Sequence, residues 1–175
     1  MLTLKTVTTR ATTRTELLAP AGSPEALEAA VAAGADAVYF GASAYNARMG
    51  AKNFGDEELA DAIRFCQATG VKTNITVNTL AYDRELAGLL KTVERLYILG
   101  CDALIVADLG AAALIHKYFP DLTLHASTQA AGHNLAAAEQ LYKLGFSRMV
   151  AARELSYQNL KLLCERSPIE TELFI

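Results

Sequence analysis

One pattern occurs three times along this chain, as Ala33-Gly34-Ala35-Asp36-Ala37-Val38, Leu99-Gly100-Cys101-Asp102-Ala103-Leu104 and Leu144-Gly145-Phe146-Ser147-Arg148-Met149. Each copy places a glycine at the end of a helical segment, two residues before a small or acidic position and an apolar strand. Successive units of this kind produce a parallel sheet, because every strand is reached through a crossover helix. Six or seven such units favour a (β/α) TIM-like barrel over an open doubly wound sheet.

Short apolar strands and amphipathic helices alternate on either side of this repeat. Strands are expected over residues 17–19, 37–40, 71–77, 103–107, 122–124, 149–152 and 171–175. Helices are expected between them, beginning near Ser23, Asp56, Asp83, Asp108, Asn134 and Ser156. An eight-unit barrel typically takes about 250 residues, so this chain of 175 residues is predicted to be an incomplete barrel of about seven parallel strands.

The length indicates one domain with a sizeable core. The barrel is assigned to residues 16–175, and residues 1–15 are expected to form a flexible N-terminal extension. That extension holds Lys5, Arg10 and Arg14, seven threonines and no acidic residue, and it lacks the apolar stretch of a secretory signal. An organelle-targeting leader is the alternative interpretation.

The composition is that of a soluble globular protein, with 52% hydrophobic and 20% charged residues. The net charge of −3 supplies no global basic field that would attract nucleic acid or an anionic membrane, and no apolar run reaches the roughly 18 residues of a membrane span. Three widely spaced cysteines, each expected to pack on or beside a helix, argue against a disulfide framework and favour a reducing cytoplasm. No metal site is predicted, since the histidines form no ligand pattern.

The strand expected over residues 71–77 is polar on one face. Lys72, Asn74 and Thr76 alternate with apolar or small residues, and Asn78 follows. A parallel strand covered by helices on both faces should instead be continuously apolar. The polar face therefore predicts a barrel interior, in which Asn74 and Thr76 hydrogen-bond and Asn78 reaches the rim.

Polar residues also collect where the expected strands end, most densely in Leu122-Thr123-Leu124-His125-Ala126-Ser127-Thr128-Gln129. Ligands of parallel α/β proteins bind beyond the carboxyl ends of the strands, so we expect the functional site there. The candidate substrate-binding residues are Asn46, Arg48, Asn78, Asp108, Ser127, Thr128 and Gln129. The candidate catalytic residues are His125, Arg153 and Glu154.

Each of these residues has a functional and a structural interpretation. Arg48 and Arg153 suit bidentate binding of a carboxylate or phosphate, which predicts an anionic ligand, yet Arg153 and Glu154 would equally pair with neighbours to stabilise loops. His125 has a reference pKa near neutrality and suits general acid–base work, or it only hydrogen-bonds within the rim. Asp108 stands where it would also cap a helix.

Several motifs together closely resemble the amino-terminal part of the peptidase U32 family. They are Glu16-Leu17-Leu18-Ala19-Pro20-Ala21-Gly22, Gly34-Ala35-Asp36-Ala37-Val38-Tyr39, Asn46-Ala47-Arg48, Val77-Asn78-Thr79, Asp102-Ala103-Leu104-Ile105-Val106-Ala107-Asp108-Leu109-Gly110, Leu124-His125-Ala126-Ser127-Thr128-Gln129 and Ala152-Arg153-Glu154-Leu155-Ser156. This family includes collagenases and bacterial RNA- and ubiquinone-hydroxylation proteins. The form of the motif at His125 is most similar to the RNA-hydroxylation branch.

The resemblance implies the substrate-binding barrel of an iron–sulfur-dependent enzyme that hydroxylates an rRNA or tRNA base or a small aromatic. It also implies that the cluster is held by cysteines beyond Ile175, because Cys66, Cys101 and Cys164 do not match the family's cluster pattern. The chain by itself is then expected to be inactive and to self-associate through an open barrel edge. The expected partner of the whole protein is an anionic small molecule or RNA, and no membrane. A U32-type peptidase or collagenase and a non-catalytic RNA- or partner-binding module are the alternatives.

Overall fold

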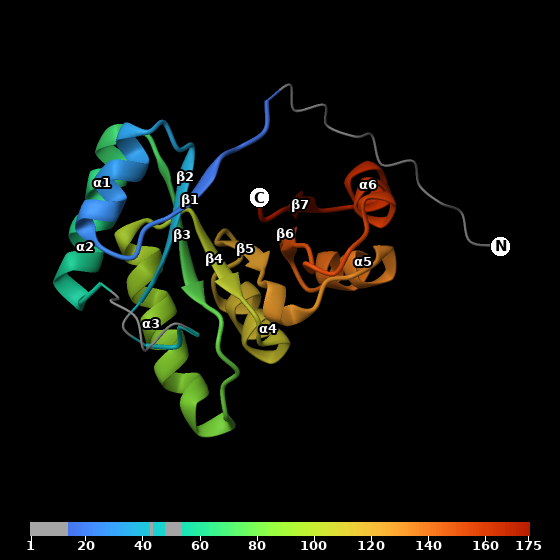
Figure 1. Cartoon of the computed structure of the whole chain (residues 1–175). Coiled ribbons are helices and arrows are strands. Elements are labelled where there is room, and N and C mark those ends of the chain that lie inside the picture. Colours follow the sequence, from blue (N-terminus) through green and yellow to red (C-terminus); the bar gives the residue numbers. More distant parts are fainter. Residues whose placement is uncertain (1–13, 43, 48–53) are drawn as a thin grey trace.

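The computed structural model describes residues 14–42, 44–47 and 54–175 and contains one curved parallel sheet (Figure 1). Its strands are β1 (Leu18–Pro20), β2 (Ala37–Gly41), β3 (Lys72–Val77), β4 (Ala103–Val106), β5 (Thr123–Ala126), β6 (Phe146–Val150) and β7 (Glu170–Glu172). They pair in chain order from β1 to β7, and every pairing is parallel.

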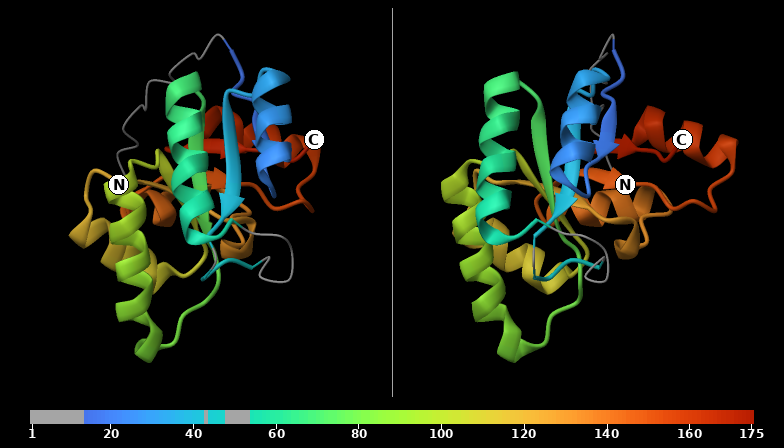
Figure 2. Two further views of the ribbon diagram at one scale, coloured as in Figure 1. Left: turned by 90° about the vertical axis from the view of Figure 1, so that its left-hand side faces the viewer. Right: turned by 60° about the vertical axis from the view of Figure 1, so that its left-hand side comes forward.

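Helices connect successive strands and cover the convex side of the sheet (Figure 2). They are α1 (Pro24–Ala32), α2 (Asp56–Thr69), α3 (Leu86–Leu99), α4 (Leu109–Tyr118), α5 (Leu135–Lys143) and α6 (Tyr157–Arg166), with short 3₁₀ turns η1 (Asp83–Glu85) and η2 (Thr128–Ala130). The fold is therefore an incomplete TIM-like barrel, as predicted. None of the helices within the described residues is long and apolar enough to cross a membrane.

The sequence repeat performs the same structural task in all three copies. Gly34, Gly100 and Gly145 have φ angles of 86°, 77° and 91°, a left-handed conformation that only glycine adopts without strain. Two residues later, a polar side chain bonds to the backbone of the preceding strand or the residues leading into it. Asp36 accepts from Leu17 N, Asp102 accepts from Thr73 N, and Ser147 donates to Leu124 O. The repeat thus ends each helix and fixes the next strand beside its neighbour.

The apolar core lies between the sheet and the helices. Alternate strand residues such as Val38, Ile75, Leu104 and Leu124 are fully buried and belong to one cluster with helix residues. The opposite strand face lines the inside of the barrel and carries polar side chains, as residues 71–77 predict. Thr76 hydrogen-bonds there as expected, whereas the Nδ2 atom of buried Asn74 has no hydrogen-bond partner within the described part of the chain.

Several boundaries differ from the sequence predictions. The predicted strand over 122–124 extends through His125 to Ala126, and the predicted strand over 149–152 begins three residues earlier, at Phe146. Asp56 is the first residue of α2 and not its cap, because the cap position is Gly55, whose N–H donates to the Glu58 carboxylate. Asp83 begins η1, which precedes α3.

Two helix residues beside the core are exposed. Tyr142 in α5 has 60% of its surface exposed, and Cys164 in α6 is also exposed. Both follow an inward residue directly, Leu141 and Leu163, and a helix turns by about 100° per residue, which takes the next side chain off the buried stripe. The predicted extension over 1–15 lies almost entirely outside the described residues.

Candidate functional site

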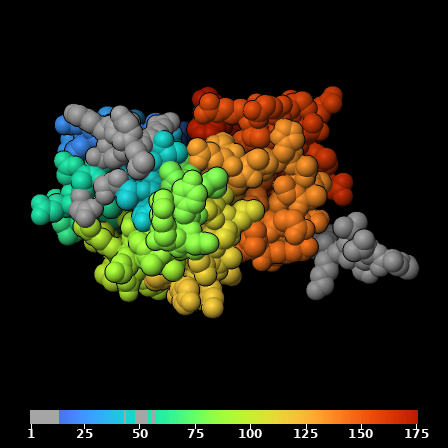
Figure 3. Space-filling model, turned by 90° about the horizontal axis from the view of Figure 1, so that it is seen from below, coloured from blue at the N-terminus to red at the C-terminus, as the bar shows by residue number. Residues whose placement is uncertain are grey.

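A pocket of about 330 Å³ lies inside the barrel at the carboxyl ends of the strands. Six strands contribute a residue to its wall, namely Pro20, Tyr39, Thr76, Ile105, Val150 and Glu172, and Ser127 follows the end of β5. Figure 3 shows the molecule from below, which is the end toward which β2 and β3 point in Figure 1. The pocket therefore occupies the position where ligands bind in barrels of this type.

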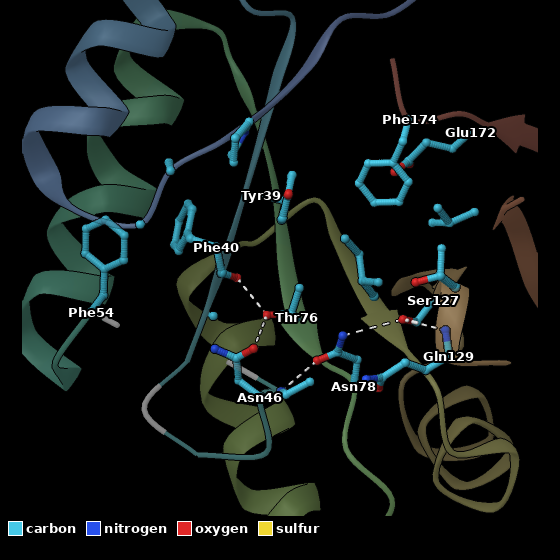
Figure 4. A pocket seen from close by; sticks show the side chains of 18 of the residues that line it. Tyr39, Phe40, Asn46, Phe54, Thr76, Asn78, Ser127, Gln129, Glu172 and Phe174 are labelled. Atoms are coloured by element: carbon cyan, nitrogen blue, oxygen red, sulfur yellow. Dashed lines mark hydrogen bonds between the residues drawn. The ribbon is translucent and has the colours of Figure 1, made fainter. Parts of the chain in front are cut away.

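One wall of the pocket is a hydrogen-bonded series of uncharged polar side chains (Figure 4). Thr76 Oγ1 donates to the side-chain oxygen of buried Asn46 at 3.1 Å. Asn78 accepts from Ala47 N at 3.0 Å and lies 3.4 Å from Ser127 Oγ through its Nδ2 atom. These bonds tie the segment after β2 to the ends of β3 and β5, so the predicted residues Asn46, Asn78 and Ser127 do come together.

The turn after β5 supplies the adjoining wall. Ser127 is buried, and its hydroxyl accepts from Gln129 N at the start of η2. Thr128 and Gln129 also line the pocket, as the sequence predicted. Ala131 ends this turn with a φ of 55°, which holds the chain in a tight left-handed bend after the polar residues.

The remaining wall contains residues that the sequence analysis missed. Tyr39, Glu172 and Phe174 line the pocket together with Arg153, whose guanidinium lies 4.5 Å from the centre of the Phe174 ring. Tyr39 points inward because it alternates with Val38 and Phe40 on β2, a signal that was available in the sequence. Glu172 and Phe174 gave no such signal, since their position depends on how far the last strand curls around the barrel.

His125 lies deeper in the barrel and does not line the pocket. It is the third residue of β5, is 5% exposed, and its Nδ1 atom has no hydrogen-bond partner within the described residues. Burial, with a further contribution from nearby Arg148, lowers the pKa of His125 to about 3. The imidazole is therefore neutral at physiological pH, and the role of His125 as a general acid or base stays a prediction.

An ion cluster of Glu16, Lys72, Arg148 and Glu170 lies at the amino ends of the strands, near His125. Arg148 lies 2.8 Å from Glu16 and 2.7 Å from Glu170, and Lys72 lies 2.8 Å from the other oxygen of Glu16. Burial by itself would raise the pKa of Glu16, but hydrogen bonds from Lys72 and Arg148 lower it below its usual value. Because Glu16 precedes β1 and Glu170 begins β7, Arg148 links the two edges of the open sheet.

Two other predicted site residues, Asp108 and Glu154, are not among the residues that line the pocket. Asp108 caps α4 by accepting from Ala111 N at 2.9 Å and also accepts from Ala81 N at 3.0 Å. Burial raises the pKa of Asp108, but these backbone hydrogen bonds outweigh burial and lower it. Glu154 is exposed in the loop after β6 and is not among the lining residues. Arg48 lies outside the described residues.

The described cysteines do not form a metal or cluster site. Cys66 and Cys101 are buried, and burial raises the pKa of their thiols to about 11 and about 12, which opposes the thiolate form that binds iron. Cys164 lies on α6 and is exposed. No group of three potential metal ligands occurs among the residues that the structure describes.

Comparison with known proteins gives a match to one protein family. Residues 22–175 match the model of peptidase family U32. The chain is 36% identical to tRNA hydroxylation protein P1 of Bacillus subtilis, covering 94% of this chain and 39% of that protein. It is 35% identical to a 23S rRNA 5-hydroxycytidine synthase of Escherichia coli (93% and 24% covered) and 36% identical to a collagenase of Porphyromonas gingivalis (86% and 36% covered). The chain thus spans between 24% and 39% of these relatives.

Solved structures support the same architecture. The structure of a U32 peptidase superposes with a TM-score of 0.75 at 18% identity, covering 91% of this chain and 68% of the other. A phosphoenolpyruvate phosphomutase from Streptomyces platensis gives 0.63 at 17% identity, with 91% and 67% covered. At such low identities the likeness establishes the barrel fold and leaves the chemistry open.

Proposed function

Because this chain belongs to peptidase family U32, we propose that it supplies the substrate-binding barrel of an enzyme that hydroxylates a base in rRNA or tRNA. Two of the relatives above carry RNA hydroxylation in their names, and both match over more than nine tenths of this chain. The whole protein's activity is part of the proposal, since the chain spans only a part of those relatives.

The observation that carries the proposal is the pocket at the strand ends. Its volume of about 330 Å³ is at the lower end of the range for small-ligand sites, about 300–1,000 Å³. Tyr39 and Phe174 offer aromatic surface, and Asn78 and Gln129 offer amides. Enzymes that modify a base take it out of the stack and bind it in a pocket by stacking and hydrogen bonding. This lining suits one flipped or unpaired base.

In this proposal the residues of this chain bind and orient the base. The redox step is carried out by a part of the protein outside this chain. An iron–sulfur cluster would be held by cysteines beyond Ile175, because the cysteines of this chain are separated and unsuited to cluster binding. Such a cluster would supply electron transfer. We also propose that an anionic part of the substrate or of a co-substrate lies near Arg153, and that the protein acts in the reducing cytoplasm.

The nucleoside content of rRNA and tRNA from a deletion strain tests the proposal. Loss of one hydroxylated nucleoside is expected, with recovery when the full-length gene is restored. A full-length Asn78→Ala variant should restore it less well, because Asn78 connects two walls of the pocket. Unchanged nucleoside profiles in the deletion strain would overturn the hydroxylation proposal and leave the non-catalytic module as the better explanation.

A peptidase is the second candidate, since one relative is named a collagenase. The described pocket lining contains no histidine, lysine or cysteine, and the Ser127 hydroxyl accepts hydrogen bonds from Asn78 and from Gln129 N, neither of which is a base that would activate it as a nucleophile. Incubating the full-length protein with collagen and casein, with and without a chelator, separates this candidate from the first. Cleavage that co-purifies with the protein would favour the peptidase.

A further inference from the structure

Tyr45 has a left-handed backbone conformation that its bulky side chain disfavours. Its φ angle is 61°, and among the described non-glycine residues only Ala131 also has a positive φ. A bulky residue in this region is strained and persists only where neighbouring contacts hold it. Such residues cluster at binding and active sites, and Tyr45 directly precedes Asn46 and Ala47, which both line the pocket.

Contacts with the start of α3 hold the Tyr45 side chain. The ring is partly buried against the apolar core, and its hydroxyl donates a long hydrogen bond of 3.4 Å to Glu85 O. A Cβ atom added at Gly88, the third residue of α3, would lie 2.6 Å from the Tyr45 hydroxyl oxygen, closer than Cβ atoms approach other atoms in proteins. Only glycine at position 88 therefore leaves room for this hydroxyl.

The next residue, Asn46, is tightly enclosed in the pocket wall. It is 3% exposed, and its side-chain oxygen accepts from Thr76 Oγ1 at 3.1 Å (Figure 4). Its Nδ2 atom lies directly beside Gly41, where an added Cβ atom would overlap with it. Closely packed interiors transmit displacements between neighbouring residues. The position of the Asn46 amide therefore depends on where the backbone of Tyr45 is held.

We propose that Tyr45 is a positioning residue, which holds Asn46 and Ala47 in the pocket wall by docking against Gly88 of α3. Tyr45 is itself not among the lining residues, so it acts through its two neighbours. A binding site is held in its productive geometry by supporting residues anchored on rigid elements, and a helix is such an element. This inference rests on the proposed function and adds a residue that shapes the pocket from outside.

Gly88→Ala tests the contact, because it places a methyl group against the Tyr45 hydroxyl. Alanine favours helices more than glycine does, so α3 itself should lose no stability. Tyr45 should be displaced, and the 175-residue chain should bind uridine and cytidine about fivefold more weakly in calorimetric titration, the effect of about one lost hydrogen bond. Gly110→Ala, the same change in the first turn of α4, is the matched control and should keep the wild-type affinities.

Tyr45→Phe provides a rescue of the Gly88 variant. Phenylalanine keeps the ring but lacks the oxygen, and ring atom Cζ would lie at an ordinary contact distance of 3.8 Å from the new methyl group. The double variant Tyr45→Phe/Gly88→Ala should therefore bind both nucleosides as tightly as Tyr45→Phe does. Tyr45→Gly accepts the left-handed φ without strain but has no ring, so it should bind as weakly as Gly88→Ala.

NMR reports the position of Asn46 without any ligand. In the wild type, nuclear Overhauser contacts should join the Asn46 side-chain amide to the α-protons of Gly41. These contacts should weaken in Gly88→Ala and return in the double variant. Unchanged contacts in Gly88→Ala, or weakened contacts with unchanged nucleoside affinity, would overturn the proposal. A double variant as weak as Gly88→Ala would overturn it too, because the alanine would then act on something other than the Tyr45 hydroxyl.

The two proposals fail in distinguishable ways. If the wild type binds neither nucleoside, the base assigned to the pocket is wrong, and the Asn46 contacts in the variant series decide whether Tyr45 is a positioning residue. If affinity follows these contacts while RNA from the deletion strain keeps its hydroxylated nucleosides, Tyr45 positions the pocket wall and the hydroxylation reaction is wrong.

Discussion

The barrel contains two polar regions that differ in whether protein atoms or open space meet the polar side chains. In the ion cluster, Arg148 and Lys72 meet the carboxylates of Glu16 and Glu170 at 2.7–2.8 Å. In the pocket, side chains such as Asn78 and Gln129 instead surround a space of about 330 Å³. Charges that the protein itself satisfies indicate a structural role, whereas polar side chains around a cavity indicate ligand binding.

The position of each region along the strands agrees with this difference. Glu16 and Lys72 lie before or at the first residue of a strand, whereas Asn78 and Ser127 lie just past the last one. Barrels use the carboxyl face for chemistry and the amino face for stability. Variants in the ion cluster should therefore change stability, and variants in the pocket should change binding.

Removing Arg148 is the largest expected perturbation of stability. In Arg148→Met, Glu16 would keep Lys72 as an ion-pair partner. Glu170 would lose its ion pair with Arg148. Arg148 is largely buried but Glu170 is 63% exposed, so the loss of unfolding free energy should lie between the values for exposed and for fully buried pairs, at about 2–3 kcal/mol. Urea unfolding at pH 7 measures the loss.

A surface ion pair provides the control for Arg148. Arg64 pairs with Asp61 on α2, and both side chains are more than 60% exposed. Arg64→Met should cost less than about 1 kcal/mol, as exposed pairs do. Similar losses in the two variants would mean that the ion cluster contributes no more than a surface pair.

Acidification should destabilise the protein through His125. The folded pKa is about 3 because of burial and Arg148, and the unfolded value is near 6.5. Between these values the unfolded state binds more protons, so the free energy of unfolding falls as the pH falls. From pH 6.5 to 4.5 the wild type should lose about 2 kcal/mol more than His125→Gln.

Urea midpoints at several pH values in this window provide the measurement. Both proteins share the other titrating groups, including Glu172, so the difference between them isolates His125. His133→Gln makes the same chemical change at an exposed position and is measured beside it as the control. A wild-type slope that persists in His125→Gln would place the acid sensitivity on other groups.

Asp108 should contribute to stability as a helix cap. Asp108→Ala removes the acceptor for Ala111 N and Ala81 N and should cost about 1–2 kcal/mol of unfolding free energy at pH 7. Asp108→Asn keeps a side-chain oxygen and should lose less. If the alanine variant unfolds like the wild type while ligand affinity drops, Asp108 belongs to the binding site after all.

The sequence predicted the fold well because the repeat is local. Each repeat consists of a glycine, a polar residue two positions later and the start of an apolar strand, all within six residues. These residues fix each strand to its neighbour. The pocket residues Asn78, Ser127 and Gln129 were also predictable, because they follow strands directly. His125 lies inside the barrel and not at its rim because β5 continues to Ala126. No local pattern distinguishes a strand that ends at Leu124 from one that ends at Ala126.

Long-range placement explains what the sequence could not predict. Glu172 lines the pocket only because the sheet curves through the six preceding strands. No local sequence pattern predicts how strongly a sheet curves. The ion cluster likewise joins Glu16, Lys72, Arg148 and Glu170 from positions far apart in the chain. Asp108 follows β4 within two residues and Glu154 comes directly after the pocket residue Arg153, yet neither lines the pocket.

Replacing Arg153 should have the smallest effect on stability. It therefore tests most clearly whether pocket variants change binding and not stability. Its side chain is exposed and contacts the Phe174 ring, a contact worth about 0.5–1 kcal/mol at exposed sites. Arg153→Ala should therefore unfold within about 1 kcal/mol of the wild type. If Arg153 holds an anion, the variant should lose about tenfold or more of its affinity for uridine 5′-monophosphate and little for uridine.

Titration of both ligands into the wild type, Arg153→Ala and Lys161→Ala measures this difference. Lys161 lies on α6, is exposed and pairs with Glu165, so its removal changes the net charge equally without touching the pocket lining. An equal loss for uridine and its monophosphate would mean that Arg153 acts by holding the Phe174 ring in place. An equal loss in Lys161→Ala would mean that the phosphate senses only the overall charge. A loss confined to the monophosphate and to Arg153→Ala would place the anion at the rim of the pocket.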